Sequence, residues 1–114
     1  MSRDFRVHLD DILEAIRRIQ VYTHGMAPDQ FFEDEKTFDA VVRNLEVIGE
    51  AVKQLPRGLR TRHRGVDWKK IAGLRDILIH EYFGIDREII WDIVQNKIPG
   101  LDREARRILA DPLD

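Results

Sequence analysis

Apolar residues recur at alternating steps of three and four in the stretch that follows residue 37. The positions are Phe38, Val41, Leu45, Ile48, Val52 and Leu55. An α-helix turns once in about 3.6 residues, so this spacing lines them along one stripe, as in a coiled-coil seam. A half-buried strand would instead need a period of two. The pattern therefore predicts a helix over about residues 34–55 that buries one face against other helices.

The N-terminal part of the chain has the same kind of spacing. Apolar residues at steps of four and three predict an amphipathic helix from about residue 4 to residue 23, namely Phe5, Leu9, Ile12, Ile16 and Ile19. Gly25 and Pro28 are typical of a helix stop, and Pro56 and Gly58 end the next helix in the same way.

Two more helices are expected in the C-terminal half. Asp67 is a candidate N-cap for a helix that extends to about Phe83, and Asp86 is a candidate N-cap for the one after it. The first of these is apolar on more than one side, so we expect it to be the central helix. Pro99 and Gly100 are expected to break the chain before a short last helix.

These segments predict an all-α fold, an up-and-down bundle of four main helices plus a short C-terminal helix. A chain of 114 residues supports one domain, over residues 1–114. It has no cysteine, which excludes disulfides and thiolate metal sites. No apolar run approaches ~18 residues and no signal peptide is recognisable, so we expect a cytoplasmic protein without a membrane span.

Polar groups interrupt the third predicted helix in the run Arg75-Asp76-Ile77-Leu78-Ile79-His80-Glu81-Tyr82. Burying a guanidinium or an imidazole among isoleucines costs several kcal/mol unless the group is paired or faces a cavity. A plain core would hold leucine at these positions. The run therefore predicts a functional site.

Helical geometry relates these polar residues to one another. Asp76 and His80 are four residues apart, so the carboxylate can orient the imidazole. Arg75 and Tyr82 are seven residues apart and would share a stripe. Arg75 and His80 diverge by about 140° around the helix, too far for one helix to aim both at one point. A site built between two copies of this helix would bring them together, and we therefore expect a homodimer.

Arg75, His80 and Tyr82 have the spacing R-x4-H-x-Y, which resembles the signature of the HepT type of HEPN-domain proteins. The flanking runs Gly73-Leu74-Arg75 and Tyr82-Phe83-Gly84-Ile85-Asp86 are similar to that family, as is the stretch from Arg43 to Ala51. The resemblance extends from about residue 4 to residue 110. Many HEPN proteins have asparagine directly after the arginine, where this chain has Asp76.

The resemblance implies a HEPN-like bundle that acts as a metal-independent endoribonuclease, the toxin of a type II toxin–antitoxin pair. His80 would move the proton of the ribose 2′-hydroxyl or of the leaving oxygen, Arg75 would hold the phosphate, and Asp76 would orient His80. In the family a minimal nucleotidyltransferase antitoxin attaches AMP to the tyrosine of the signature, which here is Tyr82. No cofactor and no metal is implied.

Basic residues lead into this helix. Residues 53–75 have a net charge of +7, although the whole chain has −2. Such a stretch is what binding to a phosphate backbone needs, although a solvated basic loop explains it equally well. The residues expected to bind RNA are Arg57, Arg60, Arg62, Arg64, Lys69 and Lys70.

Structural explanations compete with the catalytic one. Arg75 could form an ion pair, for instance with Glu50, His80 could be a satisfied core histidine, and Tyr82 a packed aromatic. The other histidines, His8, His24 and His63, lack metal-ligand spacing and are expected at the surface. The chain could also be a non-catalytic helical module that presents RNA or another substrate to a nucleotidyltransferase, or a purely structural dimerisation protein.

Overall fold

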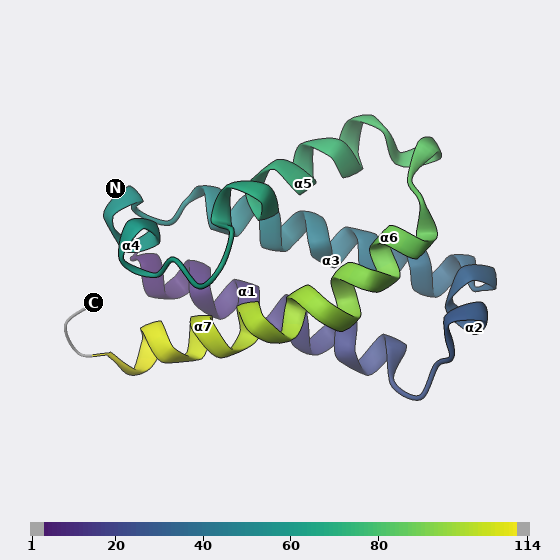
Figure 1. Cartoon of the computed structure of the whole chain (residues 1–114), viewed down its shortest axis with the longest axis horizontal. Coiled ribbons are helices and arrows are strands. Elements are labelled where there is room, and N and C mark those ends of the chain that lie inside the picture. The colour runs from purple at the N-terminus through teal and green to yellow at the C-terminus, as the bar shows by residue number, and fades with distance from the viewer. Residues whose placement is uncertain (1–3, 112–114) are drawn as a thin grey trace.

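A computed structural model describes residues 4–111, and over this range every element is helical, as the sequence predicts. The long helices are α1 (Phe5–Thr23), α3 (Glu35–Lys53), α5 (Trp68–His80) and α7 (Ile98–Ala110). Three short α-helices, α2 (Pro28–Glu33), α4 (Arg57–Arg62) and α6 (Arg87–Asp92), lie between them. Helices α2 and α4 were not predicted, because both are about one and a half turns long and lie at a proline, Pro28 or Pro56, that predicts the end of the preceding helix. Figure 1 shows the elongated bundle that results.

Aspartates cap the starts of three of the four long helices, α1, α3 and α5, and of the short helix α6. The side chain of Asp4 accepts a hydrogen bond from the Arg6 amide, and that of Asp34 accepts one from the Thr37 amide. Asp67, predicted as a cap, accepts from the Lys70 amide at 3.2 Å. Asp86 caps α6 through the Glu88 amide at 2.8 Å, also as predicted. Each cap satisfies a backbone donor that has no partner inside its helix.

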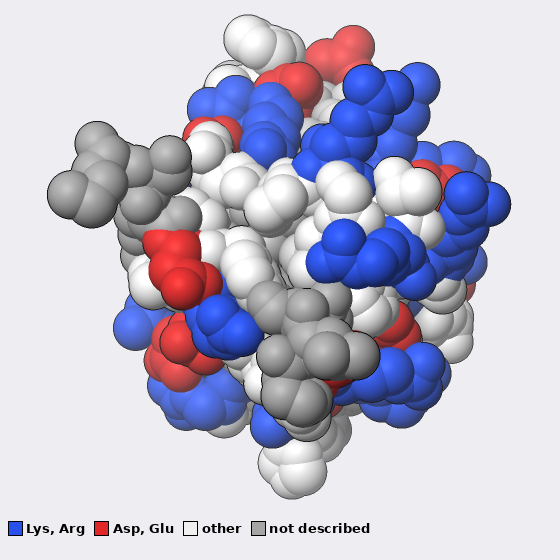
Figure 2. Space-filling view, turned by 90° about the vertical axis from the view of Figure 1, so that its left-hand side faces the viewer, with Lys and Arg blue, Asp and Glu red and all other residues white. Residues whose placement is uncertain are grey.

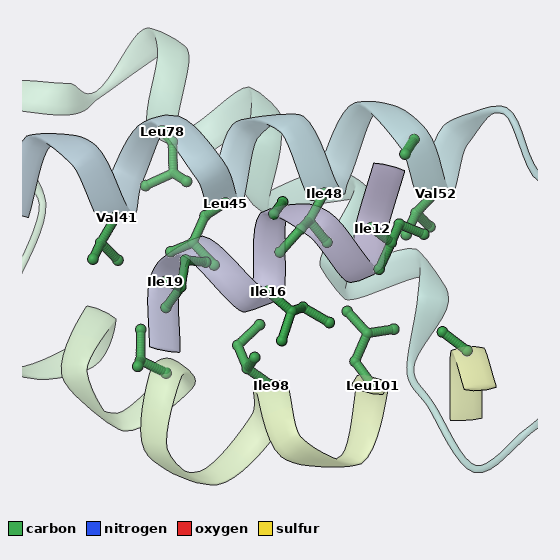
Figure 3. Packing of buried hydrophobic residues seen from close by; sticks show 14 of the residues in the cluster. Ile12, Ile16, Ile19, Val41, Leu45, Ile48, Val52, Leu78, Ile98 and Leu101 are labelled. Atoms are coloured by element: carbon green, nitrogen blue, oxygen red, sulfur yellow. The ribbon is translucent and has the colours of Figure 1, made fainter. Parts of the chain in front are cut away.

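The core lies between α1, α3 and α7. Figure 3 shows the side chains of α1, Ile12, Ile16 and Ile19, between those of α3 on one side and Ile98 and Leu101 of α7 on the other. These residues are almost fully buried, as are all the residues of the predicted α3 stripe. Burying an aliphatic side chain of this size contributes roughly 1.5–3 kcal/mol, so the core is the main source of stability.

Helix α3, not α5, is the central helix. It packs against α1 on one face and against α5 on the other, whereas α5 packs chiefly on α3 (Figure 1). Only Trp68 and Leu78 of α5 are buried, and Ile77 and Ile79 are 51% and 43% exposed. The expectation of a central α5 was wrong. Apolar residues on several sides of a helix show that its surface is apolar, but they do not show that other helices of the same chain bury that surface.

A glycine sets how closely α5 approaches α3. A Cβ atom built on Gly49 of α3 would lie 2.5 Å from Arg75 Cβ and 3.1 Å from the Ile71 carbonyl oxygen of α5. Neither distance is compatible with an unshifted backbone. The absence of a side chain at Gly49 therefore permits the contact, and it places Arg75 directly on α3.

The C-terminal segments form one continuous rod, which corrects the predicted break at Pro99 and Gly100. A π-helical turn, Ile93–Lys97, joins α6 directly to α7, and the Ile98 amide donates to the carbonyl of Ile93. Proline lacks an amide donor and its ring collides with the carbonyl four residues earlier in a regular helix. The wider turn before Pro99 accommodates the ring without ending the helix.

Helix α5 ends at His80, before the predicted end at Phe83. The Glu81 amide caps it by donating to the Ile77 carbonyl, and residues Tyr82–Gly84 form a separate 3₁₀ turn. Tyr82 packs on Phe38 of α3, with ring centroids 6.3 Å apart. This contact turns the chain off the helix axis, so Tyr82 does not share a helical stripe with Arg75. Within residues 4–111, no helix combines the length and apolarity that a membrane crossing requires.

Gly49→Ala is expected to destabilise the fold by about 1–3 kcal/mol, because the added methyl group forces α3 and α5 apart. Gly73→Ala is the matched control on α5, since a Cβ there meets nothing within 4 Å. It should stabilise the helix by about 0.5–1 kcal/mol. Urea denaturation followed by circular dichroism measures both. Equal stability of the two variants would contradict the close contact.

Candidate functional site

Arg75 lines a groove between α1, α3 and α5. The groove has a volume of about 630 Å³ and is open to solvent. Helix α1 contributes His8 and Asp11 to its wall, α3 contributes Arg43, Glu46 and Glu50, and α5 contributes Arg75 and Ile79. Because Arg75 and Ile79 are one turn apart, the same side of α5 faces the groove along its middle and last turns.

Carboxylates hold the Arg75 side chain in place. Its Nε lies 3.2 Å from Glu50 Oε2, and its Nη1 donates to Asp76 Oδ1 at 3.0 Å. Lys53 Nζ donates to the same Asp76 oxygen at 2.9 Å. The hydrogen bonds from Lys53 and then from Arg75 hold the pKa of Asp76 below its ordinary value. The ion pair with Glu50 is the one that the sequence analysis weighed, and Lys53 is a member of the cluster that it missed.

His80 lies apart from Arg75. It is exposed at the last turn of α5, on the side of Asp76 rather than on the side that lines the groove. The expected hydrogen bond between Asp76 and His80 is absent among the described residues, because Asp76 is turned towards the two cations Lys53 and Arg75. One copy of the chain therefore brings Arg75 and Asp76 together but leaves His80 separate, as the 140° divergence predicts.

Tyr82 is held by α3. Its hydroxyl donates a hydrogen bond to Asp39 Oδ1, and this contact raises the pKa of Tyr82, with burial of the ring as the second cause. The sequence analysis did not find Asp39, which is 43 residues from Tyr82 along the chain. The antiparallel pairing of α3 and α5 could have predicted this contact. Because Gly49 lies opposite Arg75, residues near 40 lie opposite those near 82.

The predicted RNA-binding residues gather at the opposite end of α5 from His80. Arg57, Arg60, Arg64 and Lys69 line a hollow of about 650 Å³ between α4 and the start of α5. Figure 2 faces this end of the bundle and shows Lys and Arg side chains across its upper and right-hand parts. At about 1.5 Å rise per residue, Lys69 and His80 are about 16 Å apart along the helix.

Two histidines that we expected at the surface are not exposed: His8 is buried and His63 is half-buried. His8 is only 7% exposed and faces the groove beside Arg75. His63 Nδ1 lies 3.0 Å from Glu104 Oε1, and both side chains are largely buried between the loop before α5 and α7. His8 lies one turn before Ile12 on the buried face of α1 and was misplaced because its polar ring was not counted with that face. His63 lies in a loop, where no periodicity indicates burial. Among residues 4–111, no three His, Asp or Glu side chains are grouped as a metal site requires.

Together these residues form a site suited to a phosphate group. A guanidinium presents several donors in a planar fork that matches phosphate oxygens, and Arg75 is preorganised by its carboxylates on the groove wall. An exposed imidazole five residues later can accept or release a proton. The two side chains are the kinds of group that anion binding and proton transfer need, but in one copy of the chain they lie apart.

Comparison with known proteins identifies relatives of the chain. A family model described as ribonuclease HepT-like matches residues 12–108. An inferred RNase of Methanocaldococcus jannaschii is 51% identical over 96% of this chain and 91% of its own length. An inferred ribonuclease HepT of Thermococcus cleftensis is 42% identical over 95% of this chain and 98% of its own.

A solved structure has the same fold. The crystal structure of a toxin–antitoxin with AMP-PNP contains a chain that superposes with a TM-score of 0.72, covering 96% of this chain and 100% of that one. The sequences are 22% identical. The likeness supports the assignment of an all-α, HEPN-like bundle.

Asp76→Asn is expected to lower the melting temperature near pH 7, by an amount that shrinks as the pH falls through the folded-state pKa of Asp76. A carboxylate whose folded-state pKa is depressed contributes stability above its unfolded pKa, about 3.9, and loses it as the pH falls through the folded value. Thermal melts of wild type and variant between pH 2 and pH 7 measure the difference. Asp10→Asn, at an exposed position on α1, is the control. A constant difference at every pH would show that charge is not the cause.

Proposed function

Because this chain belongs to the HepT-like ribonuclease family, we propose that it is an endoribonuclease and the toxin of a type II toxin–antitoxin pair. The observation that carries the proposal is the position of Arg75, preorganised on the wall of an open groove, with an exposed His80 five residues further along the same helix. The spacing is that of the family signature.

The proposed reaction is an internal transesterification. The ribose 2′-oxygen attacks the adjacent phosphorus while His80 takes its proton or protonates the leaving 5′-oxygen. Arg75 binds the phosphate oxygens and stabilises the charge that develops on them. RNA supplies the nucleophile, so the reaction needs no metal and DNA is not a substrate. Asp76, directed to Arg75, positions the guanidinium instead of orienting His80.

A homodimer would complete the site. The last turn of α5 and the segment after it expose apolar surface, with Ile77 at 51%, Phe83 at 101% and Ile89 at 57%. Exposed apolar surface of this kind is typical of an interface. Two copies that meet through this surface would bring His80 of one chain towards Arg75 of the other.

The basic residues at the far end of the bundle would then bind RNA away from the scissile phosphate. Arg57, Arg60, Arg62, Arg64, Lys69 and Lys70 provide positive charge for backbone contacts that are independent of sequence. Their separation from His80 favours a substrate of several nucleotides over a dinucleotide.

Regulation is proposed to act at Tyr82. The cognate minimal nucleotidyltransferase antitoxin would attach AMP to its hydroxyl. The adduct would place a bulky, negatively charged phosphodiester two residues from His80 and repel the RNA backbone.

A non-catalytic binding module is the second candidate. It is favoured by the pairing of Arg75 with two carboxylates, which reduces the net positive charge available to a phosphate. Such a module would bind RNA and present it, or another substrate, to the nucleotidyltransferase without cleaving it.

Arg75→Ala and His80→Ala are each expected to reduce RNA cleavage by about 10²-fold or more, measured on labelled RNA in the presence of a chelator. Helical content and melting temperature should change little, because His80 is exposed and Arg75 is one third exposed. Arg106→Ala, which removes an ion-paired arginine of α7, is the control and should retain activity. Wild-type protein that leaves RNA intact in chelator would favour the binding module.

Ile77→Glu is expected to convert a dimer into a monomer and to abolish cleavage, because it places a charge in the proposed apolar interface. Light scattering at micromolar concentration measures the mass. Val21→Glu, at a residue of α1 that is 59% exposed, is the matched control and should remain dimeric. A monomeric, active wild-type protein would contradict the composite site.

Tyr82→Phe is expected to fold, to keep at least part of the ribonuclease activity and to resist neutralisation by the nucleotidyltransferase with ATP and magnesium. The substitution keeps the ring on Phe38 and removes the acceptor oxygen. Mass spectrometry should place the AMP of the wild-type protein on Tyr82. An adduct on Tyr22, the other tyrosine of the chain, would contradict the assignment.

A further inference from the structure

The hydroxyl of Tyr82 is fixed by groups of the chain itself. Its ring lies between Phe38 of α3 and Phe83, with centroid distances of 6.3 and 5.2 Å. The phenolic oxygen donates to Asp39 Oδ1, and Asp39 is exposed at the second turn of α3. The oxygen is therefore held at the edge of the molecule, where an incoming reagent could reach it.

Three charged groups surround the hydroxyl. Asp39 contacts it, and Glu35, on the preceding turn of α3, acts on it at longer range with the same sign. Arg87 of α6 is the opposing cation, and it is already engaged: its Nη1 donates to the Phe32 carbonyl at 3.1 Å and its guanidinium stacks 4.1 Å from the Phe38 ring centre. The balance is negative, so the pKa of Tyr82 is raised, first by the hydrogen bond to Asp39.

A phenol with a raised pKa is almost fully protonated at neutral pH, and a protonated phenol is a weak nucleophile. Any transfer of a group to this oxygen must remove the proton during the reaction. The carboxylate of Asp39 already accepts that proton in a hydrogen bond. In protein kinases, which transfer a phosphoryl group to a hydroxyl, an aspartate beside the hydroxyl accepts its proton.

We propose that Asp39 is the general base for nucleotidyl transfer to Tyr82, supplied by the modified chain and not by the modifying enzyme. The inference rests on the proposed modification of Tyr82 by a nucleotidyltransferase. In the step, Tyr82 Oη forms a bond to the α-phosphorus of ATP, the bond from that phosphorus to the bridging oxygen breaks, and pyrophosphate leaves. The phenolic proton passes to Asp39 Oδ1.

This assignment also accounts for selectivity between the two tyrosines. Tyr22 is 40% exposed, yet it makes no hydrogen bond to a carboxylate among the described residues. Accessibility alone would not favour Tyr82, whose ring is half-buried. A carboxylate already in contact with the hydroxyl distinguishes Tyr82 chemically.

The test measures the rate of AMP incorporation from α-labelled ATP and magnesium by the cognate nucleotidyltransferase into wild type and four variants. Asp39→Asn keeps an oxygen that accepts the hydrogen bond but cannot take up the proton. Asp39→Ala removes both functions. Glu35→Gln removes the same charge one turn away and is the matched control, and Tyr82→Phe tests the acceptor. Circular dichroism and melting temperatures establish that each variant is folded.

We expect Asp39→Asn to slow incorporation about 10²-fold or more and Glu35→Gln to leave it within about twofold of wild type. Without its base, the reaction depends on the small phenolate fraction, so the Asp39→Asn rate should rise about tenfold per pH unit between pH 6 and pH 9. The wild-type rate should be nearly flat over that range.

Each contrary outcome has a separate meaning. If Asp39→Asn reacts as fast as Glu35→Gln while wild type is labelled on Tyr82, Asp39 is not the base and the proposed modification stands. If Asp39→Asn is slow but keeps the wild-type pH profile, Asp39 only positions the ring and the assignment fails. If wild type is not labelled, or Tyr82→Phe is labelled equally, the proposed modification itself fails.

Discussion

The contact between α3 and α5 at Gly49 is the constraint on which the candidate site depends. Within residues 4–111, helix α5 packs chiefly on α3, so its distance and register are set mainly there. With Gly49 against Arg75, the antiparallel register places Glu50 beside the guanidinium, Lys53 beside Asp76 and Asp39 beside Tyr82. A side chain at position 49 would alter all three contacts together. One glycine therefore determines the geometry of residues that are spread over more than a third of the chain.

This register places two carboxylates, Glu50 and Asp76, beside the positive charge of Arg75. Two carboxylates compensate its charge in the absence of ligand, and Lys53 in turn compensates Asp76. In the proposed function, a phosphate that enters the groove would have to exchange with these carboxylates instead of meeting an unpaired cation. Such an exchange weakens binding of simple anions and favours ligands that make further contacts along the molecule. The basic residues around α4 can supply those contacts.

The sequence predicts most of the fold because burial in α1 and α3 has the period of a helix. Leu9, Ile12 and Ile16, or Val41, Leu45 and Ile48, need only local spacing to be recognised as core. Predictions from the sequence were wrong where the position of a side chain depends on contacts between segments that are distant along the chain. Asp76 accepts a hydrogen bond from Lys53 and not from His80. Tyr82 lies outside α5 and packs on Phe38. His63 contacts Glu104, 41 residues away. The divergence of Arg75 and His80 was predictable, because it follows from helical geometry alone.

The π turn before Pro99 has a consequence for how the chain tolerates changes in length. Ile90, Val94 and Ile98 are successive buried residues four apart, and in a regular α-helix two such steps would rotate the buried face by about 80°. The wider turn reduces that rotation, and Leu101, Ala105 and Ile108 of α7 are buried as well. Because a π turn holds one residue more than an α-helical turn, deleting one residue between 93 and 97 would restore a regular α-helix without rotating the buried face of α7. It would also bring the Pro99 ring against the carbonyl four residues earlier. The number of residues in this turn is thus tied to Pro99, which a regular α-helix of one residue fewer would not accommodate.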